Sequence, residues 1–173
     1  MTGCPARRGR KGTGAVGVSG NAPFTGMSTG TLDKKARVCV PASWRHILAA
    51  QNTNGVYVRI ALLTPSLECF GARVMQKFHD AQTEADPFFT AAHDTEAFAL
   101  LSLSHELSID ETGRVRLPDD FITHAGLAEN VTFVGMGSKF EIWDSTQYAP
   151  IYHERMAAAQ AMLRAKQQQA RKP

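Results

Sequence analysis

The chain has 173 residues and a net charge of +3, with 43% hydrophobic and 20% charged residues, which is typical of a soluble globular protein. This length suits one domain, or two small domains that share a core. No stretch approaches the roughly 20 apolar residues that span a bilayer. No apolar stretch follows the basic residues of the first dozen positions, so we expect no secretory signal.

The positive charge is concentrated at the two ends of the chain. Residues 1–23 carry four basic groups and no acid, and the chain from Tyr152 onward carries +4, which leaves about −5 for the middle. A body of this charge does not attract nucleic acid as a whole, so DNA binding requires a local basic patch. Residues 1–22 are rich in Gly, Ser, Thr and basic side chains, which predicts a disordered basic extension.

An internal repeat organises the rest of the chain. The stretch LDKKARVCVP returns 77 positions later as IDETGRVRLP, which aligns Asp33 with Asp110 and Arg37 with Arg114. A repeat of this kind indicates two copies of one supersecondary unit. We therefore look for the function at the Asp-x-x-x-Arg spacing that both copies contain.

In the first copy, the pattern predicts a short strand over 31–33, a turn to residue 36 and a second strand over 37–40. Pro41 ends that strand because it has no amide proton for a ladder. Ser43 is placed to cap a helix over WRHILAA, with Trp44, Ile47 and Leu48 as its buried stripe. The β-branched and aromatic run VYVRIALL then predicts a strand over 56–63.

The second copy repeats this plan. Strands are predicted over 105–109 and 114–117, with a turn between them, followed by the short helix FITHA. Asp119 or Asp120 is placed to cap this helix and Gly126 to close it. VTFVGMG and KFEIWD are then two strands joined by a hairpin. Helical patterns cover the connection between the copies, at residues 71–101, and the tail, at residues 147–169.

The Asp-x-x-x-Arg motif has two interpretations. The carboxylate can accept the amide protons of its own turn and pair with the Arg four residues on, which is a structural role. Alternatively, Asp33 orients the guanidinium of Arg37, whose planar fork suits phosphate groups and guanine edges. The spacing alone favours neither interpretation.

Local charge separates the two copies. The first has a local charge of +3 over residues 31–48, and its basic residues are Lys34, Lys35, Arg37 and Arg45. The second has a local charge of −2 over residues 108–125, despite Arg114 and Arg116. We therefore expect the first copy to contact DNA and the second mainly to complete the fold.

The chain resembles the MraZ family of the AbrB/SpoVT superfamily in several short motifs that occur in the same order. These are the two Asp-x-x-x-Arg motifs, Phe24-x-Gly26 before them, Asp86-Pro87-Phe88 between them, and HAGL and FEIWD after them. The resemblance covers about residues 24–150. It implies a mainly β fold with flanking helices, namely a double-split β-barrel made of two swapped-hairpin units in one chain. The implied division is unit 1 at 27–74, a helical connector at 75–103, unit 2 at 104–147, and a C-terminal helix and tail at 148–173.

By the same resemblance, we expect a cytoplasmic, nucleoid-associated transcriptional regulator that forms a homo-oligomeric ring. It would bind double-stranded DNA at short tandem repeats upstream of the division and cell-wall gene cluster, including its own gene. The family signature falls on Asp33 and Arg37 and on Asp110 and Arg114. Ala36 replaces the usual Gly, which the second copy keeps at Gly113. A positive φ there would cost Ala about 1 kcal/mol.

Other functions are disfavoured by what the sequence contains. The six histidines show no i, i+4 pair and no neighbouring cysteine, so we expect no metal site. Neither a GxSxG motif nor a P-loop is present, and each motif Asp has an Arg that keeps it ionised, so we expect no enzyme, cofactor or small-molecule substrate. The alternative is an antitoxin-like interaction module whose C-terminal tail binds a protein partner.

Overall fold

The computed structural model of the protein describes residues 20–84 and 90–170. Most of the predicted disordered extension, at residues 1–19, and the Asp86-Pro87-Phe88 motif lie outside the described residues. Disorder of the extension therefore stays a prediction.

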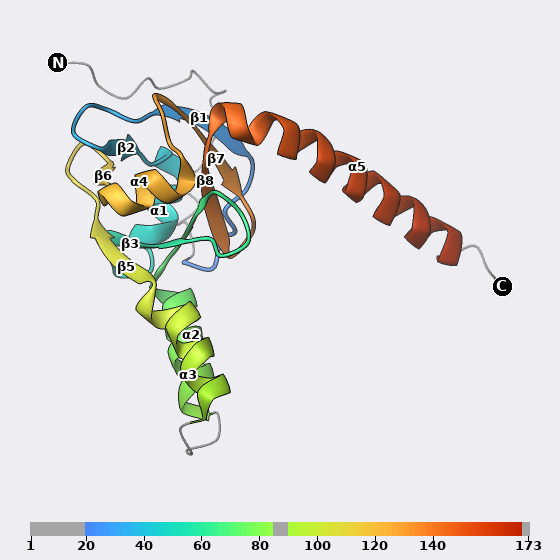
Figure 1. Ribbon diagram of the computed structural model, residues 1–173, viewed down its shortest axis with the longest axis horizontal. Helices are drawn as coiled ribbons and strands as arrows, with labels where there is room; N and C mark the ends of the chain where they lie inside the picture. Colours follow the sequence, from blue (N-terminus) through green and yellow to red (C-terminus); the bar gives the residue numbers. More distant parts are fainter. Residues whose placement is uncertain (1–19, 85–89, 171–173) are drawn as a thin grey trace.

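The described chain folds into a mixed α+β structure (Figure 1). In chain order, its elements are β1 (Met27–Thr31), β2 (Arg37–Cys39), α1 (Ala42–Ala49), β3 (Gly55–Ile60), β4 (Leu67–Phe70), α2 (Ala72–Glu84), α3 (Ala91–Ala97), the π-helical turn η1 (Phe98–Ser102), β5 (Ser104–Ser108), β6 (Arg114–Arg116), α4 (Asp119–Ala125), β7 (Asn130–Gly135), β8 (Lys139–Asp144) and α5 (Ser145–Ala170). Each copy thus contributes strand, turn, strand, helix, strand and strand, as the repeat predicts.

Six strands form one sheet, in the order β1-β7-β8-β4-β3-β5. The first strand of each unit pairs with the third strand of the other unit, because β1 lies beside β7 and β5 beside β3. The last strands of the two units, β4 and β8, pair in the middle. All of these pairs are antiparallel, and their order is symmetric about the β4–β8 pair, as two equivalent copies require.

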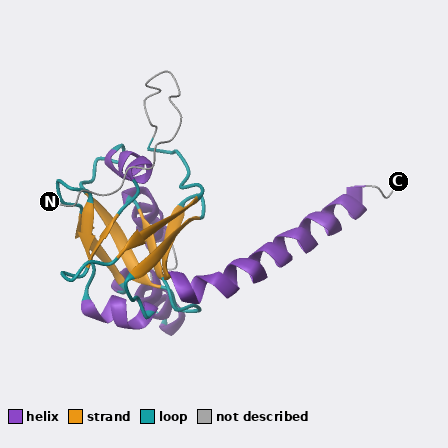
Figure 2. Cartoon of the chain, turned by 90° about the horizontal axis from the view of Figure 1, so that it is seen from above, coloured by secondary structure: helices purple, strands orange, loops and turns teal. Residues whose placement is uncertain are grey.

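The second strands of the two units, β2 and β6, form a separate antiparallel ladder. The α+β class, with an antiparallel sheet and flanking helices, is confirmed (Figure 2). Helix has a larger share than a mainly β fold implies, since α5 alone spans 26 residues. The six-stranded sheet is open, with β1 and β5 at its edges, so closure into a double-split barrel stays a prediction.

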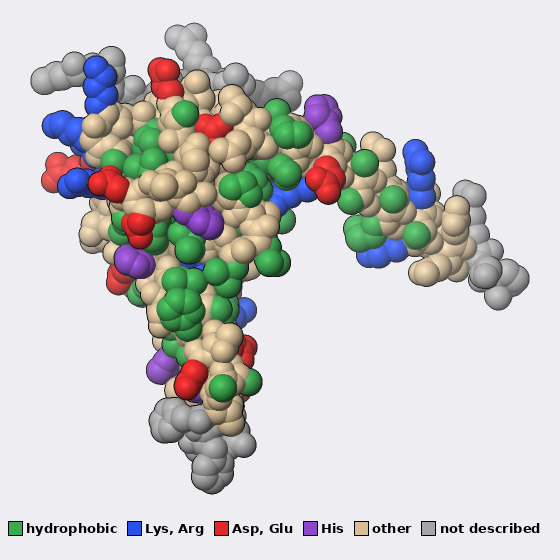
Figure 3. Space-filling model, viewed as in Figure 1, with side chains coloured by type: hydrophobic (Ala, Val, Ile, Leu, Met, Phe, Trp, Pro, Cys, Tyr) green, Lys and Arg blue, Asp and Glu red, His purple; other side chains and the backbone are tan. Residues whose placement is uncertain are grey.

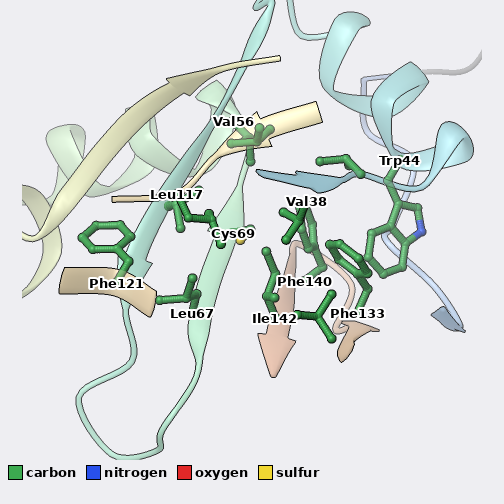
Figure 4. Packing of buried hydrophobic residues seen from close by; sticks show 14 of the residues in the cluster. Val38, Trp44, Val56, Leu67, Cys69, Leu117, Phe121, Phe133, Phe140 and Ile142 are labelled. Atoms are coloured by element: carbon green, nitrogen blue, oxygen red, sulfur yellow. The ribbon is translucent and has the colours of Figure 1, made fainter. Parts of the chain in front are cut away.

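The main hydrophobic core joins the two units. Figure 4 shows Val38 of β2 and Leu117, just after β6, in the same cluster as Phe140 and Ile142 of β8. The helices add their apolar stripes from both units, and the predicted stripe of α1, at Trp44, Ile47 and Leu48, is buried. Because burial of apolar surface is the main stabilising term, neither unit is expected to be stable alone.

Two predicted helix starts are wrong. Ser43 and Asp120 lie inside α1 and α4, and Asp119 is the first residue of α4; no side-chain cap hydrogen bond is made in either helix. The physical reason is that Pro41 and Pro118, which end β2 and β6, take the N-cap position themselves. The predicted end of α4 is confirmed, because Gly126 is left-handed, with φ of 55°.

The strand predicted over 56–63 ends earlier than expected, because β3 stops at Ile60. The next residues form a tight connection in which the Ala61 amide donates to the Ser66 carbonyl at 3.0 Å. This connection returns the chain antiparallel into β4. The hairpin predicted between β7 and β8 is present, with Gly137 at φ of 78°.

Two helical segments extend from the body in different directions (Figure 1). The helices α2 and α3 lie together, and the His93 ring contacts the Gln82 carbonyl at 3.2 Å. The helix α5 is anchored only near its start, where Tyr148 is buried and Arg155 pairs with Glu141 at 2.8 Å. None of the described helices has the length and apolar content that a membrane span requires.

Candidate nucleic-acid interface

The β2–β6 ladder brings the two copies of the motif together at one edge of the molecule. Val38 pairs with Val115, and both are buried, while Arg37 pairs with Arg116. Side chains alternate along a strand, so burial of the two valines places the arginines on the opposite face. Figure 3 shows basic and acidic side chains gathered at the edge where β2 and β6 lie in Figure 1.

In the first turn, the Asp33 carboxylate fixes both the backbone and the arginine. Its Oδ1 accepts the amide protons of Lys35 at 2.8 Å and of Arg37 at 3.0 Å. Its Oδ2 accepts from Arg37 Nε at 2.9 Å and lies 2.8 Å from Arg37 Nη2. The fork of the guanidinium is therefore held at two points. The structural role and the orienting role, which the sequence leaves as alternatives, are thus performed by the two oxygens of one carboxylate.

The second turn repeats the backbone part of this arrangement. Asp110 Oδ1 accepts the amide protons of Thr112 and Arg114, each at 2.9 Å. It also accepts from the Thr112 hydroxyl at 2.7 Å. Position 112 corresponds to Lys35 of the first copy, so the second turn replaces a cation by a neutral hydroxyl that binds its own aspartate.

The two turns are also joined to each other. Arg37 Nη1 lies 3.8 Å from Asp110 Oδ2, and Arg114 Nη1 lies 3.7 Å from Asp33 Oδ2. Backbone hydrogen bonds also join the two turns. The Val40 amide, after β2, donates to the Gly113 carbonyl at 3.0 Å, and the Leu117 amide, after β6, donates to the Ala36 carbonyl at 2.8 Å. The two motifs therefore form one site, which we call the turn pair, defined by residues 33–37 and 110–114.

Both aspartates of the turn pair are ionised at neutral pH. Desolvation acts to raise the pKa of Asp33, but the hydrogen bonds that it accepts from Arg37 and Lys35 outweigh this effect and hold the pKa below its ordinary value. The pKa of Asp110 is also lowered, chiefly by the hydroxyl of Thr112 and the amide of Arg114. The ionised carboxylate of Asp33 keeps the Arg37 guanidinium in a fixed direction, which is what a recognition site requires.

Position 36, where Ala replaces the usual Gly, has a left-handed conformation. Ala36 has φ of 59°, and Gly113, its counterpart, has φ of 81°. Alanine in this region carries a strain of about 1 kcal/mol or more, since Cβ approaches the next carbonyl oxygen. Both turns nevertheless make the same closing hydrogen bond, from residue 36 to Asp33 and from residue 113 to Asp110. Ala36 therefore preserves the shape of the first turn at an energetic cost.

Arg45, predicted to contact DNA from the first copy, lies against the second turn. A Cβ built on Gly113 would come within 2.5 Å of Arg45 Cζ, so the guanidinium covers that glycine. Arg45 Nε is buried and has no hydrogen-bond partner among the described residues. Arg45 therefore supports the second turn, and a role in DNA contact stays a prediction.

The lysines Lys34 and Lys35 are exposed, as a phosphate contact requires. With Ala36, Arg37, Arg116 and Asp119, they line an open pocket of about 370 Å³ beside the turn pair. Arg116 was not predicted as a site residue, because it belongs to the second copy, which we expected mainly to complete the fold. The register of the ladder could have found it, because antiparallel pairing of the two repeats places residue 116 opposite residue 37.

Among the described residues, no group of three or more His, Cys, Asp or Glu side chains could hold a metal ion. The turn pair instead presents the guanidinium groups of two arginines, which are paired with carboxylates. Arg37 and Arg114 are 29% and 25% exposed, so both guanidinium groups are partly accessible to a ligand in solvent.

The fold and the site define a class of protein: an α+β chain in which two copies of one unit exchange strand partners and present paired Asp–Arg turns. The sequence pattern of the family described as "MraZ protein, putative antitoxin-like" matches residues 100–170. The chain is 39% identical over 121 residues to a protein of Xanthobacter autotrophicus named transcriptional regulator MraZ, which covers 70% of this chain and 76% of the relative.

A protein of the same name from Parvibaculum lavamentivorans is 36% identical over 152 residues, covering 82% of this chain and 94% of the relative. A third, from Gluconobacter oxydans, is 33% identical over 144 residues, covering 82% and 85%. This similarity extends over both copies of the motif. The chain belongs to the MraZ family.

Proposed function

We propose that this protein is a transcriptional regulator that binds double-stranded DNA through the turn pair. The observation that carries the proposal is that Arg37 and Arg114, 77 residues apart in sequence, are both partly exposed and both pair with the carboxylate of Asp33. The relatives described above are named transcriptional regulators, which supports the same role.

The side chains of the turn pair suit two kinds of DNA contact, namely hydrogen bonds to base edges and contacts with the neighbouring phosphates. A guanidinium held at two points by Asp33 presents its remaining N–H donors in a fixed direction, and such a fork fits guanine O6 and N7 or a phosphate. Lys34 and Lys35 are exposed beside it and supply the sequence-independent attraction. This local patch explains how a body of negative net charge binds a polyanion.

Assembly is the second part of the proposal. The two swapped-hairpin units of each chain make a double-split barrel, and several chains form a ring that places one turn pair on each of several short tandem repeats. A single weak patch then gains affinity through effective concentration. The sites lie upstream of the division and cell-wall gene cluster, including the gene of the protein itself, and the protein works in the cytoplasm at the nucleoid.

Footprinting of the DNA upstream of the protein's own gene tests this proposal. The full-length protein is titrated onto that fragment and, as the matched control, onto a shuffled fragment of the same length and composition. We expect protection of evenly spaced short repeats on the first fragment only. Equal protection of both fragments, or no protection at low salt, would contradict sequence-specific DNA binding.

The second candidate is an antitoxin-like interaction with a protein partner. The helix α5 projects from the body (Figure 1), and its exposed large apolar side chains are Tyr152, Met156, Met162 and Leu163. The family description also contains the word antitoxin-like, and its match extends to residue 170. The two candidates differ in the residues they need. DNA binding requires Arg37 and tolerates Leu163→Glu, whereas partner binding through α5 shows the opposite pattern.

A further inference from the structure

The open pocket beside the turn pair is made by both copies of the unit. Lys34, Lys35, Ala36 and Arg37 come from the first copy, and Arg116 and Asp119 from the second. The β2–β6 register places Arg37 directly opposite Arg116. Neither copy alone forms this pocket, so its charge is not apparent when each copy is counted separately.

The cations of the pocket are largely unneutralised. Arg37 pairs with Asp33 and Asp110, but no ion pair within the described residues includes Lys34, Lys35 or Arg116. Asp119 is the single acid among the described residues of the lining, and it makes none of these pairs either. Four cations around one cavity repel one another, and a concave surface of one dominant sign concentrates its field. An anion in the pocket would relieve this repulsion.

The opposite side of the turn pair lacks this charge. The 77-residue offset maps the six lining positions onto Glu111, Thr112, Gly113, Arg114, Cys39 and Ala42. Only Arg114 is basic among them, and Glu111 offsets it. The two turns make the same closing hydrogen bond, whereas the group of basic lining residues belongs to one side.

We infer that this pocket binds one phosphodiester of the DNA backbone, with Arg116 as its bidentate ligand and Lys34 and Lys35 as flanking charges. The inference rests on the proposed function and adds an orientation to it. Because the corresponding positions on the second side carry one arginine and one acid in place of this group of cations, the protein docks on each DNA repeat in one direction only. Arg116 is then a positioning residue: it holds the backbone while Arg37 reaches the bases.

Two substitutions with opposite expected effects test the inference. The full-length protein is titrated against a labelled duplex of the tandem repeats by fluorescence anisotropy, at salt concentrations between about 50 and 200 mM. We expect Arg116→Ala to weaken binding by about tenfold. The slope of the logarithm of the affinity against the logarithm of the salt concentration should become smaller by about one, as loss of one phosphate contact predicts. We expect Asp119→Asn to strengthen binding, because it removes the one acid found among the described residues that line the pocket.

The matched control is Arg164→Ala, which removes one positive charge from an exposed position on α5. It should leave affinity and slope unchanged. Circular dichroism confirms that each variant is folded, which is expected because Arg116 is exposed. If Arg116→Ala behaves like the control while Arg37→Ala loses binding, the phosphate pocket is wrong and the proposed function stands. If the unmodified protein does not bind the duplex at all, the proposed function itself fails.

Substitution of single DNA phosphates identifies the group that is bound. Neutral methylphosphonates are placed one at a time along both strands of one repeat. We expect one position on one strand to weaken binding of the unmodified protein and to have no further effect on Arg116→Ala. Losses at symmetric positions on both strands would overturn the single orientation. Binding of inorganic phosphate that depends on Arg116, with DNA affinity unchanged by Arg116→Ala, would overturn the DNA phosphodiester as the ligand.

Discussion

The first and second turns share a backbone and differ in what surrounds it. Each begins with an aspartate that accepts two amide protons, and each has a left-handed residue at its fourth position, Ala36 or Gly113. The first turn has two exposed lysines, Lys34 and Lys35, where the second has Glu111 and a threonine. A repeated geometry therefore carries different chemistry on its two sides.

The glycine position shows why the copies could diverge. Gly113 is buried beneath the guanidinium of Arg45, and a Cβ at this position would require that guanidinium to move. The position that corresponds to Arg45 in the second copy is Ile122, which has no guanidinium to place over Ala36. A side chain in the second turn therefore needs both a positive φ and a shift of the Arg45 guanidinium, whereas the first turn has only the φ requirement, which alanine meets with strain.

The sharpest test of this comparison exchanges the two motif arginines for alanine. We expect Arg37→Ala to reduce DNA affinity by roughly 100-fold or more, since a well-placed bidentate contact and its flanking lysines act together. We expect Arg114→Ala to retain most binding, because its neighbours are Glu111 and Thr112. Gel shifts on the same duplex measure both variants.

The structure supplies a reason to check the folding of both variants. Each arginine lies within 3.8 Å of the aspartate of the opposite turn, so either substitution removes one contact between the turns. A matched pair of unfolding curves in urea establishes whether the two losses of stability are similar. Equal losses of DNA affinity, with similar stability, would show that the two turns contribute equally.

Exchanging glycine and alanine at the two left-handed positions tests how strain and crowding differ between the turns. Gly113→Ala should lower the free energy of unfolding by about 1–3 kcal/mol, because it adds both backbone strain and a clash with Arg45. Ala36→Gly should raise it by up to about 1 kcal/mol, since relief of strain exceeds the entropy cost of glycine. Denaturation in urea measures both changes.

A further variant separates strain from crowding at Gly113. In the presence of Arg45→Ala, which removes the covering guanidinium, Gly113→Ala should cost only the strain, about 1 kcal/mol. If the cost of Gly113→Ala is the same with and without Arg45, crowding does not fix the glycine.

The sequence predicted the parts of this structure that local rules determine. The repeat predicted the order of the elements in each unit, and the motif spacing predicted both turns. The positive φ at Ala36 was not predicted, since the sequence showed only that Ala replaces the usual Gly there. The caps of α1 and α4 were missed because a proline that ends a strand can also occupy the N-cap, and the preference for Ser or Asp does not compete with it.

The site was predicted less completely, because its parts come from both copies. Along the chain, Arg116 is offset by neighbouring acids, so the second copy has a negative local charge. The ladder places Arg116 opposite Arg37, and α1 places Arg45 over Gly113. Both are contacts between distant segments, which only the pairing of the two units reveals.

The smallest expected effect is the acid sensitivity of the turn pair. The pKa values of Asp33 and Asp110 lie below their ordinary value of 3.8, so the folded state favours the ionised carboxylates more than the unfolded state does. Their stabilisation is fully present above that ordinary value and is lost as the pH falls through the lowered pKa values. The free energy of unfolding, measured between about pH 5 and pH 3, should therefore decline less steeply for Asp33→Asn than for the unmodified protein.

Because the Arg37 guanidinium is bound mainly by Asp33, Asp110→Asn should flatten the decline less than Asp33→Asn does. The reverse order would contradict the difference between the two turns.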